Sequence, residues 1–337
     1  MEPAFATALD RLGQAGVRPD DVAAIAHRVV HGGATYTSPT LVDDAVLAGI
    51  DALAPLAPLH DPVAAAAIRA ARRRLPGLPN VAVFDTAFHA TLPETARRYP
   101  VPAGWDAWGI RRFGFHGLSV AWSMERAAEL LRRPATDLGL VVAHLGNGCS
   151  VTAVAGGRSV ATSMGMTPLE GLMMGTRSGS IDPGILLAVL RDRRLTLENL
   201  SEVLDHGSGL LGVSGTSGDM RALQSSSAAG DPSATLAIAM FVERAAAGIA
   251  AAATALSRLD AVVFTAGIGE GAGPVRASIV DRLAVLGVAP VEADENGLDR
   301  ILSGGGDSPA VLRIEAREDL VAARAAVAVL GEAAVSG

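Results

Sequence analysis

Short apolar runs rich in β-branched residues alternate along this chain with alanine-rich stretches that have helical spacing. The run at 22–30 is followed by the alanine-rich segment 62–74 and then by a second run at 81–84. Runs of this kind are typical of buried strands, and strands that alternate with helices build largely parallel sheets. The pattern therefore predicts an α/β fold, and 337 residues are enough for two domains of ordinary size.

The middle of the chain contains a predicted hairpin. An apolar run at 138–145 is followed by Gly146-Asn147-Gly148 and by a second run at 150–154, so we expect positive φ angles at the turn glycines. A later strand at 261–265 leads into a glycine-rich turn and a helix from about Val275.

Two further segments are rich in turn-forming residues. We interpret the serine-rich segment 225–232 as an ordinary polar loop and the glycines at 304–306 as a turn or a flexible connector.

The composition excludes several classes of protein. The net charge of −7 argues against nucleic-acid binding, which needs clustered cations. All 28 basic residues are arginine, so a Walker-A lysine and a Schiff-base lysine are excluded. The single cysteine, Cys149, cannot form an intrachain disulfide, and it lies beside a turn where a buried packing role is favoured over a nucleophile.

Neither of the two segments that could suggest a membrane protein does so. Residues 1–13 carry charges in a helical pattern, which is unlike a signal peptide. The apolar stretch 236–256 is interrupted by Glu243 and Arg244, and we interpret it as a buried helix. We therefore expect a soluble cytoplasmic protein that acts on small molecules, without a nucleic-acid or membrane partner.

Six of the seven histidines lie in short blocks beside glycine, arginine or aspartate. Several blocks follow the carboxyl end of a predicted strand, where ligands bind in open α/β sheets. One block alone is more often a core histidine next to a turn, but five together favour a functional site. The blocks are HRVVHGG (27–33), LH (59–60), FDTAFH (84–89), RFGFHG (112–117) and HLGNG (144–148).

These residue types suit phosphoryl transfer to a carboxylate, in which two anions must be brought together. Arg28 and Arg177 lie in glycine-flanked motifs, and a guanidinium grips oxygen atoms in pairs while it stays charged. The arginines at 72–74 fit a solvated helix face better. Asp85, at the end of a predicted strand, could hold or orient a divalent cation, although an acid there could also cap a helix.

Two glycine-rich turns could bring backbone N–H groups close to phosphates, Gly146-Asn147-Gly148 and Gly267-Ile268-Gly269. The second has an alternative interpretation. It follows an apolar strand, precedes a helix and has Glu292 downstream at about the spacing of a dinucleotide-binding fingerprint, so an NAD-binding Rossmann dehydrogenase is a rival. Glu270 argues against this rival, because it would put an anion near the pyrophosphate.

In this order, the blocks resemble the acetate kinase family of the sugar kinase, Hsp70 and actin superfamily. The resemblance runs from about Ile25 to Arg324. It is carried by the motifs HRVVHGG, PLAPLH, VFDTAFH, RFGFHG, HLGNGCS, MGMTPLEGLMMGTRSG, SGDMR and FTAGIGEG.

The resemblance implies a role for each matching residue. Arg28 and Arg177 would bind the carboxylate and the transferring phosphoryl group, and His116 would hydrogen-bond that group. Glu318 and Asp85 would hold or lie close to Mg²⁺ or Mn²⁺, with His60 in a supporting position. The substrate would be bound by Arg28 through its carboxylate, and a small apolar pocket for its methyl group would be lined by Val30, Leu59, Phe115 and Pro168. ATP would contact His144, Gly146, Asn147, Gly148, Asp219, Met220, Arg221, Gly267, Ile268 and Gly269.

The resemblance also implies a two-domain ribonuclease H-like α/β fold with a βββαβα-like core in each domain. We expect a first, incomplete domain at 1–85 plus 320–337 and a second, nucleotide-binding domain at 86–319. The expected reaction is a direct, in-line transfer from ATP to acetate that gives acetyl phosphate and ADP, with domain closure expelling water. A homodimer is expected as well.

The chain departs from the family pattern at a few positions. Ser180 stands where the family usually has aspartate, Ala316-Arg317-Glu318-Asp319 replaces Thr-Asn-Glu-Glu, and Gly271-Ala272-Gly273 replaces Asn-Ser-Ala. The family's opening loop, N-A-G-S-S-S-x-K, is not found, and motif positions predict that about sixty residues are absent before the first helix. The strand at 22–30 would then expose an apolar edge.

Four alternatives stay open at this point. A propionate or butyrate kinase is close, because one methylene in an apolar pocket is worth only about 1–3 kcal/mol. A start codon placed too late would explain the missing loop, and so would a truncated nucleotide-binding homologue with little activity. The dehydrogenase is the rival outside the family.

Overall fold

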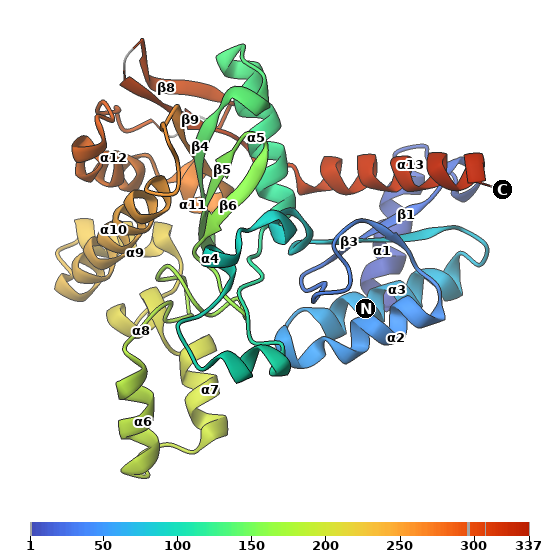
Figure 1. The fold of residues 1–337 in the computed structure, drawn as a ribbon, viewed down its shortest axis with the longest axis horizontal. Helices are drawn as coiled ribbons and strands as arrows, with labels where there is room; N and C mark the ends of the chain where they lie inside the picture. The colour runs from blue at the N-terminus through green and yellow to red at the C-terminus, as the bar shows by residue number, and fades with distance from the viewer. Residues whose placement is uncertain (1, 295–296, 307, 337) are drawn as a thin grey trace. The chain divides into compact units, whose positions relative to one another are not determined.

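The computed structural model describes residues 2–294, 297–306 and 308–336. The chain forms two compact units (Figure 1). The first consists of Met1–Ala90, Phe115–Ala121 and Arg317–Gly337, and the second of Thr91–Gly114 and Trp122–Ala316. The chain therefore passes between the units four times. The assignment of the nucleotide to the second domain stays a prediction.

The first unit is built on a small sheet of order β1-β3-β2. β1 (Ile25–Val29) and β3 (Asn80–Phe84) are parallel, with Val29 opposite Phe84, and β2 (Thr40–Leu41) is antiparallel to β3. All five residues of β3 are buried, as a central apolar strand requires. β1 lies at one edge of this sheet, and it is shorter than the predicted strand because a 3₁₀ turn at Pro19–Asp21 precedes it.

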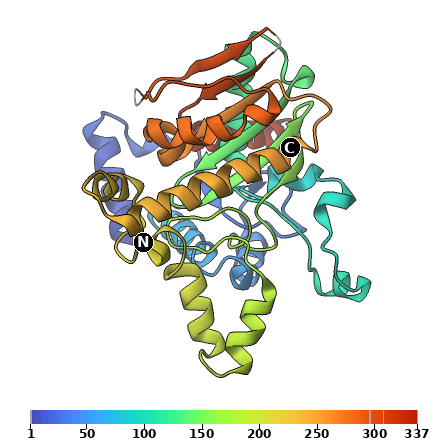
Figure 2. The same cartoon turned by 90° about the vertical axis from the view of Figure 1, so that its left-hand side faces the viewer.

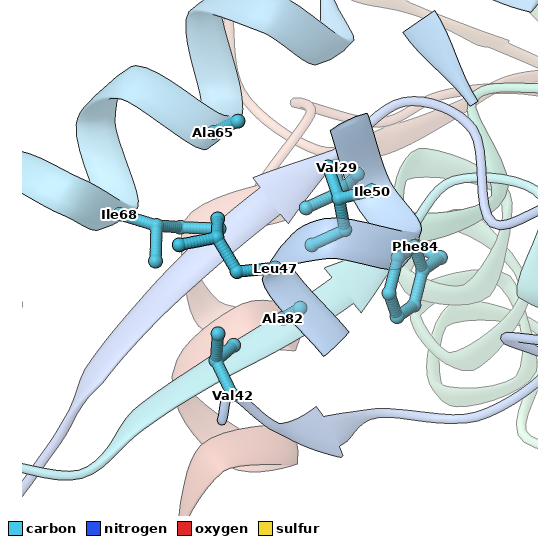
Figure 3. Packing of buried hydrophobic residues seen from close by; sticks show 8 residues of the cluster. All are labelled: Val29, Val42, Leu47, Ile50, Ala65, Ile68, Ala82 and Phe84. Carbon is cyan, nitrogen blue, oxygen red and sulfur yellow. The ribbon is translucent and has the colours of Figure 1, made fainter. Parts of the chain in front are cut away.

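Helices cover both faces of this sheet. Figure 3 shows one core cluster, in which Leu47 and Ile50 of one helix and Ile68 of another pack against Val29 and Phe84 of the strands. Asp43 caps the first of these helices by accepting from the Val46 N–H. The elements are α1 (Glu2–Gln14), α2 (Asp44–Ala52), η2 (Ala54–Leu56), α3 (Asp61–Arg74), the start of α5 (Gly117–Leu131) and α13 (Glu318–Ser336).

The second unit contains a mixed sheet of order β6-β5-β4-β7-β9-β8. Three strands form an antiparallel meander, β7 and β9 are parallel to β4, and β8 is antiparallel to β9. Its antiparallel meander differs from the parallel sheet of a Rossmann domain. The strands are β4 (Gly139–Leu145), β5 (Cys149–Ala155), β6 (Arg158–Thr162), β7 (Ala261–Thr265), β8 (Arg300–Gly305) and β9 (Ser308–Arg313).

Helix α10 (Pro232–Ala253) is long and apolar enough to cross a membrane by length and composition. It instead lies along the sheet of the second unit (Figure 2) and buries one face that includes Phe241, Val242 and Ile249. It is therefore the core helix that the sequence predicts.

The other helices of this unit are shorter. They are η3 (Ala87–Thr91), which spans a unit boundary, α4 (Glu94–Arg97), η4 (Ala103–Trp108), η5 (Ala135–Asp137), α6 (Pro183–Arg191), α7 (Leu197–His206), α8 (Gly209–Ser214), α9 (Met220–Ala228), α11 (Ala266–Gly271), α12 (Gly273–Arg282) and η6 (Ala284–Leu286).

Two predictions about turns are wrong. The segment 225–232 is not wholly a loop, because α9 continues to Ala228 after Asp219 has capped its first turn. The turn glycines Gly146 and Gly148 do not adopt positive φ angles; those angles occur instead at Gly156 and Gly157, between β5 and β6. The 146–148 turn is tightened by a hydrogen bond from the Gly146 N–H to the Gly148 carbonyl (3.1 Å).

Candidate active site

The centre of the first unit's site is an arginine between two carboxylates. Arg28 donates from Nε to Asp85 Oδ1 (3.0 Å) and from Nη2 to Asp85 Oδ2 (2.6 Å). Its Nη1 lies 3.3 Å from Glu318 Oε2. The side chain of Asp85 is 1% exposed whereas that of Arg28 is 42% exposed, so the guanidinium keeps an accessible face.

Backbone contacts hold Asp85 in place at the end of β3. Its N–H donates to the Val29 carbonyl of the neighbouring strand (2.9 Å), and its carbonyl accepts from the Gly117 N–H (3.0 Å). A Cβ atom at Gly117 would lie only 2.1 Å from that carbonyl, so only glycine permits the approach. The sequence RFGFHG thus places its last glycine against Asp85.

Burial and charge act in opposite directions on this cluster. Burial disfavours the charged guanidinium, but the negative charges of Asp85 and Glu318 outweigh it and raise the pKa of Arg28. Burial raises the pKa of Glu318, and the charge of Arg28 partly offsets that rise. The cluster therefore keeps its arginine charged at any working pH.

The histidines of this unit divide into different roles. His116 has a left-handed backbone (φ 59°) immediately before α5, an unusual conformation for a residue with a side chain. His89 is buried, its Nε2 is 2.9 Å from the Phe115 carbonyl, and burial lowers its pKa to about 4. His31 accepts from the Gly33 N–H through Nδ1 (2.9 Å) and contacts the Phe115 ring edge-on. His89 and His31 are thus structural, and His116 is the strained one.

Three of the four residues predicted to contact the substrate methyl group belong to the first unit. Phe115 is buried, Val30 is half-buried at the end of β1, and Leu59 is 44% exposed next to the amino end of α3. His60 is the N-cap residue of α3. The fourth, Pro168, belongs to the second unit, where its carbonyl accepts from Arg177.

Asp61 is a buried acid that the sequence analysis missed. Its side chain is fully buried at the first turn of α3, its Oδ1 accepts from the His31 N–H (3.1 Å), and its Oδ2 is buried without a hydrogen-bond partner among the described residues. Burial raises the pKa of Asp61 to about 7, although N–H donors from His31 and Val30 lower it. Its position directly after His60 in the PLAPLH block is the signal that could have found it.

The second unit contains a cleft with a volume of about 530 Å³. Residues from three segments, at 146–147, 218–221 and 267–272, form its wall. The lining residues are Gly146, Asn147, Gly218, Asp219, Met220, Arg221, Gly267, Ile268, Gly271 and Ala272. The sequence analysis named seven of these, and the structure brings them together around one cleft.

Three predicted nucleotide residues do not line this cleft. His144 is buried in β4, opposite Thr265 of β7. Gly148 closes the 146–148 turn, and Gly269 is buried against Phe264. They are neighbours in the chain of the cleft-lining Asn147 and Ile268 or lie within three residues of them.

Close packing fixes Asn147 in the cleft wall. Its carbonyl accepts from the Gly175 N–H (3.1 Å), and a Cβ atom at Gly175 would lie 2.2 Å from its side-chain oxygen. On the opposite wall, Asp219 caps α9 by accepting from the Arg221 and Ala222 N–H groups. The Arg221 side chain is 89% exposed and donates to Asp219 (3.1 Å), so its guanidinium is available to a ligand.

Arg177 differs from Arg28 because it has no carboxylate within ion-pair distance among the residues that the structure describes. It is 9% exposed, its Nη1 donates to the Pro168 carbonyl (2.7 Å), and burial lowers its pKa. A buried cation without a paired anion is costly, so Arg177 is a candidate to bind an anion. Cys149 lies nearby as a packing residue: it is fully buried, and burial raises the pKa of its thiol to about 12.

The donor set fits a magnesium ion only in part. Asp85 and Glu318 offer two hard carboxylates around Arg28, which is the number that Mg²⁺ commonly takes when substrate phosphates and water complete its shell. Among the described residues, no group of three or more acidic, histidine or cysteine side chains could hold a metal ion by itself. The residues therefore suit an ion that arrives with its nucleotide.

Comparison with known proteins identifies relatives along nearly the whole chain. Residues 2–324 match the model of the acetokinase family. The chain is 49% identical over 328 residues to the acetate kinase of Deinococcus deserti, covering 95% of this chain and 81% of that protein. It is 48% identical to the acetate kinase of Deinococcus radiodurans, covering 98% and 84% of the two chains.

Solved structures agree with the sequence matches. The Porphyromonas gingivalis acetate kinase has a TM-score of 0.90 at 33% identity, covering 98% of this chain and 85% of its own. A propionate kinase from Francisella tularensis has a TM-score of 0.89 at 39% identity, covering 96% and 83%. The predicted α/β fold of the sugar kinase, Hsp70 and actin superfamily is thereby confirmed, and the dehydrogenase alternative is wrong. With the family model matched along residues 2–324 and these relatives close to half identical, the chain belongs to the acetokinase family.

Proposed function

We propose that this protein is an acetate kinase that transfers the γ-phosphoryl group of ATP to acetate and gives acetyl phosphate and ADP. The observation that carries the proposal is the near-half identity to two acetate kinases over at least 95% of the chain. The arrangement of charges supports it, because an exposed guanidinium face and an unpaired buried arginine are what two anionic reactants need.

In this proposal the acid binds against Arg28, whose charge is held by Asp85 and Glu318. One carboxylate oxygen of acetate attacks phosphorus, the bond from phosphorus to the β–γ bridging oxygen breaks, and that oxygen leaves with ADP. Arg177 stabilises negative charge on the transferring group, and His116 donates a hydrogen bond to it. No proton has to be removed, because the acetate is already ionised at neutral pH.

The nucleotide binds in the cleft of the second unit. Backbone N–H groups near Asn147 and Ile268 face the phosphates, and Arg221 contacts the nucleotide from the opposite wall. Asp85 and Glu318 would hold the Mg²⁺ or Mn²⁺ ion. That ion would neutralise charge on the β- and γ-phosphate oxygens.

A propionate kinase is the second candidate, because the Francisella tularensis propionate kinase is 39% identical to this chain. The half-buried Val30 and the exposed Leu59 form an apolar surface that a longer acid could also use. One methylene changes binding by only about 1–3 kcal/mol in such a pocket.

The test is acyl phosphate formation from ATP, Mg²⁺ and each acid in turn, trapped with hydroxylamine. Acetate kinase is supported if kcat/KM is highest for acetate and falls about tenfold or more for propionate and again for butyrate. A higher kcat/KM for propionate would make propionate the substrate, and absence of any hydroxamate would reject both candidates.

We also propose a cytoplasmic homodimer, as the family resemblance implies. The support in this chain is the hairpin of α6 and α7, which exposes Ile185, Leu187, Leu197 and Val203. Exposed apolar side chains grouped on one projecting element are typical of protein interfaces. Sedimentation of the wild type and of a variant with Leu187→Glu and Leu197→Glu tests the proposal, since a monomeric wild type would reject it.

A further inference from the structure

Glu270 is a charged residue that the mechanism above does not use. It lies in α11, between the cleft-lining residues Ile268 and Gly271, but Glu270 is not one of the residues named as lining the cleft. Its Oε1 accepts from the Ala316 N–H (2.9 Å), which is 46 positions further along the chain. The Glu270 carboxylate therefore binds backbone at the end of the second unit.

The residues that Glu270 contacts lie where the chain leaves the second unit. Ala316 is the last residue of that unit, and Arg317 belongs to the first. Glu318, which pairs with Arg28, follows two residues after Ala316. We call residues 314–316 the crossing segment.

The crossing segment has no regular secondary structure, but side chains hold its backbone. The Glu315 N–H donates to Asp299 (2.7 Å), and the Glu315 carbonyl accepts from Trp122 Nε1 (2.8 Å). Trp122 is itself the first residue after another passage of the chain between the units. Two of the four passages are thus joined at Glu315, and Glu270 holds the residue next to it.

Glu270 belongs to the loop at 266–271, which begins with a strained backbone. Ala266 has a left-handed backbone (φ 65°), and its N–H lowers the pKa of the Glu270 carboxyl against the rise that burial causes. Arg276, which is 1% exposed, donates from Nη1 to the carbonyls of Gly269 and Glu270 (2.8 Å each). The loop is therefore fixed on its carbonyl side, while one carboxylate joins its strained N–H to the crossing segment.

We propose that Glu270 is a positioning residue that couples nucleotide binding in the cleft to the crossing segment leading to Glu318. A ligand that orders the 266–271 loop also orders the Glu270 carboxylate, and with it the Ala316 N–H. Because the coupling is reciprocal, a change in the crossing segment alters nucleotide affinity. The inference rests on the proposed function, since the nucleotide is its ligand.

Hydrogen exchange of the full-length protein with and without ADP and Mg²⁺ tests this coupling. In the wild type we expect ADP to slow exchange in both 266–272 and 312–317, by about fivefold or more. In Glu270→Ala at saturating ADP, we expect slowing only in 266–272. Glu243→Ala, which changes an exposed glutamate on α10, should match the wild type.

Steady-state kinetics separate positioning from a merely structural role. We expect Glu270→Ala to raise the KM for ATP about tenfold and to leave the KM for acetate within about twofold. Glu270→Gln keeps one acceptor oxygen and should recover most of the ATP affinity.

The outcomes distinguish this inference from the function on which it rests. If ADP slows exchange nowhere in the wild type, both the nucleotide site and the coupling are rejected. If ADP slows exchange in 266–272 but not in 312–317, or if Glu270→Ala keeps the slowing in 312–317, only the coupling is rejected. An equal rise in both KM values would also overturn it.

Discussion

The two units of this protein hold their candidate anion-binding arginines by different physical means. In the first unit, Arg28 lies between two carboxylates, so its charge is largely neutralised inside the cluster before any substrate arrives. In the second unit, four of the ten residues that line the cleft are glycine, and the buried Arg177 donates to the Pro168 carbonyl without a carboxylate nearby among the described residues. The same residue type is thus stabilised by acids in one unit and held without them in the other.

This difference indicates what each arginine contributes. A guanidinium that already has two carboxylates is fixed in orientation and can also share its site with a cation. A guanidinium without an acid keeps its full field for an incoming anion, at a cost in folding free energy. Substitutions of matched residues in the two units test this difference.

The largest effect is expected from the two arginines. Arg28→Ala and Arg177→Ala should each lower kcat by about two to three orders of magnitude, because an oriented charge is lost at the transition state. The two variants should differ in how their melting temperatures change. Arg28→Ala leaves two carboxylates facing each other and lowers the melting temperature, whereas Arg177→Ala removes an unpaired buried charge and leaves the melting temperature unchanged or higher.

Hydroxamate assays and thermal unfolding of both variants check this prediction. Arg191→Ala, at an arginine 76% exposed on α6, is the control and should match the wild type. Unchanged turnover in either site variant contradicts the assigned role, and equal loss of stability in both contradicts the difference between the units.

A pair of glycines gives the next largest effect. A Cβ atom at Gly117 would lie 2.1 Å from the Asp85 carbonyl, and one at Gly175 would lie 2.2 Å from the Asn147 side-chain oxygen. Gly117→Ala should therefore act mainly on kcat through Asp85, and Gly175→Ala should raise the KM for ATP about tenfold. Initial-rate kinetics with each substrate varied will show whether the two defects separate in this way. Gly104→Ala, where nothing lies near the added methyl group, is the matched control.

His116→Ala should have a smaller effect, a fall in kcat of about tenfold, because a single hydrogen bond from a neutral side chain is removed. The left-handed backbone at this position is kept by alanine at a similar energetic cost, so the fold should tolerate the change. A kcat as low as that of Arg28→Ala would mean that His116 does more than donate one hydrogen bond.

The smallest effect concerns Asp61 and depends on pH. Burial raises its pKa from 3.8 to about 7 in the folded protein, so folding is favoured while the carboxyl is protonated and that contribution is lost as the pH rises toward 7. Asp61→Asn mimics the protonated form. Relative to this variant, the wild type should lose stability between about pH 5 and pH 7 in urea unfolding. A difference in stability that does not change with pH would reject the raised pKa.

The sequence predicted most of the elements that carry the site. The apolar runs became β3, β4, β5 and β7, because strands of a central sheet need an uninterrupted buried sequence. The segment 225–232 was predicted wrongly because serine is common in loops, whereas the cap at Asp219 decides that α9 continues through Ser225.

The candidate site was predicted less completely than the fold. The motifs pointed to Arg28 and Asp85, but the pairing of Arg28 with Glu318 joins residues at opposite ends of the chain, which local sequence patterns do not reveal. The burial of Asp61 and the contact of Glu270 with Ala316 have the same character. Such contacts depend on tertiary packing rather than on spacing.

The most direct test of the account is a ³¹P NMR time course of ATP, Mg²⁺ and acetate with the wild type and with Arg28→Ala. The account predicts that acetyl phosphate and ADP appear in equal amounts with the wild type and about a hundredfold or more slowly with the variant. ADP that appears with inorganic phosphate and without acetyl phosphate, or equal rates with the two proteins, would contradict it.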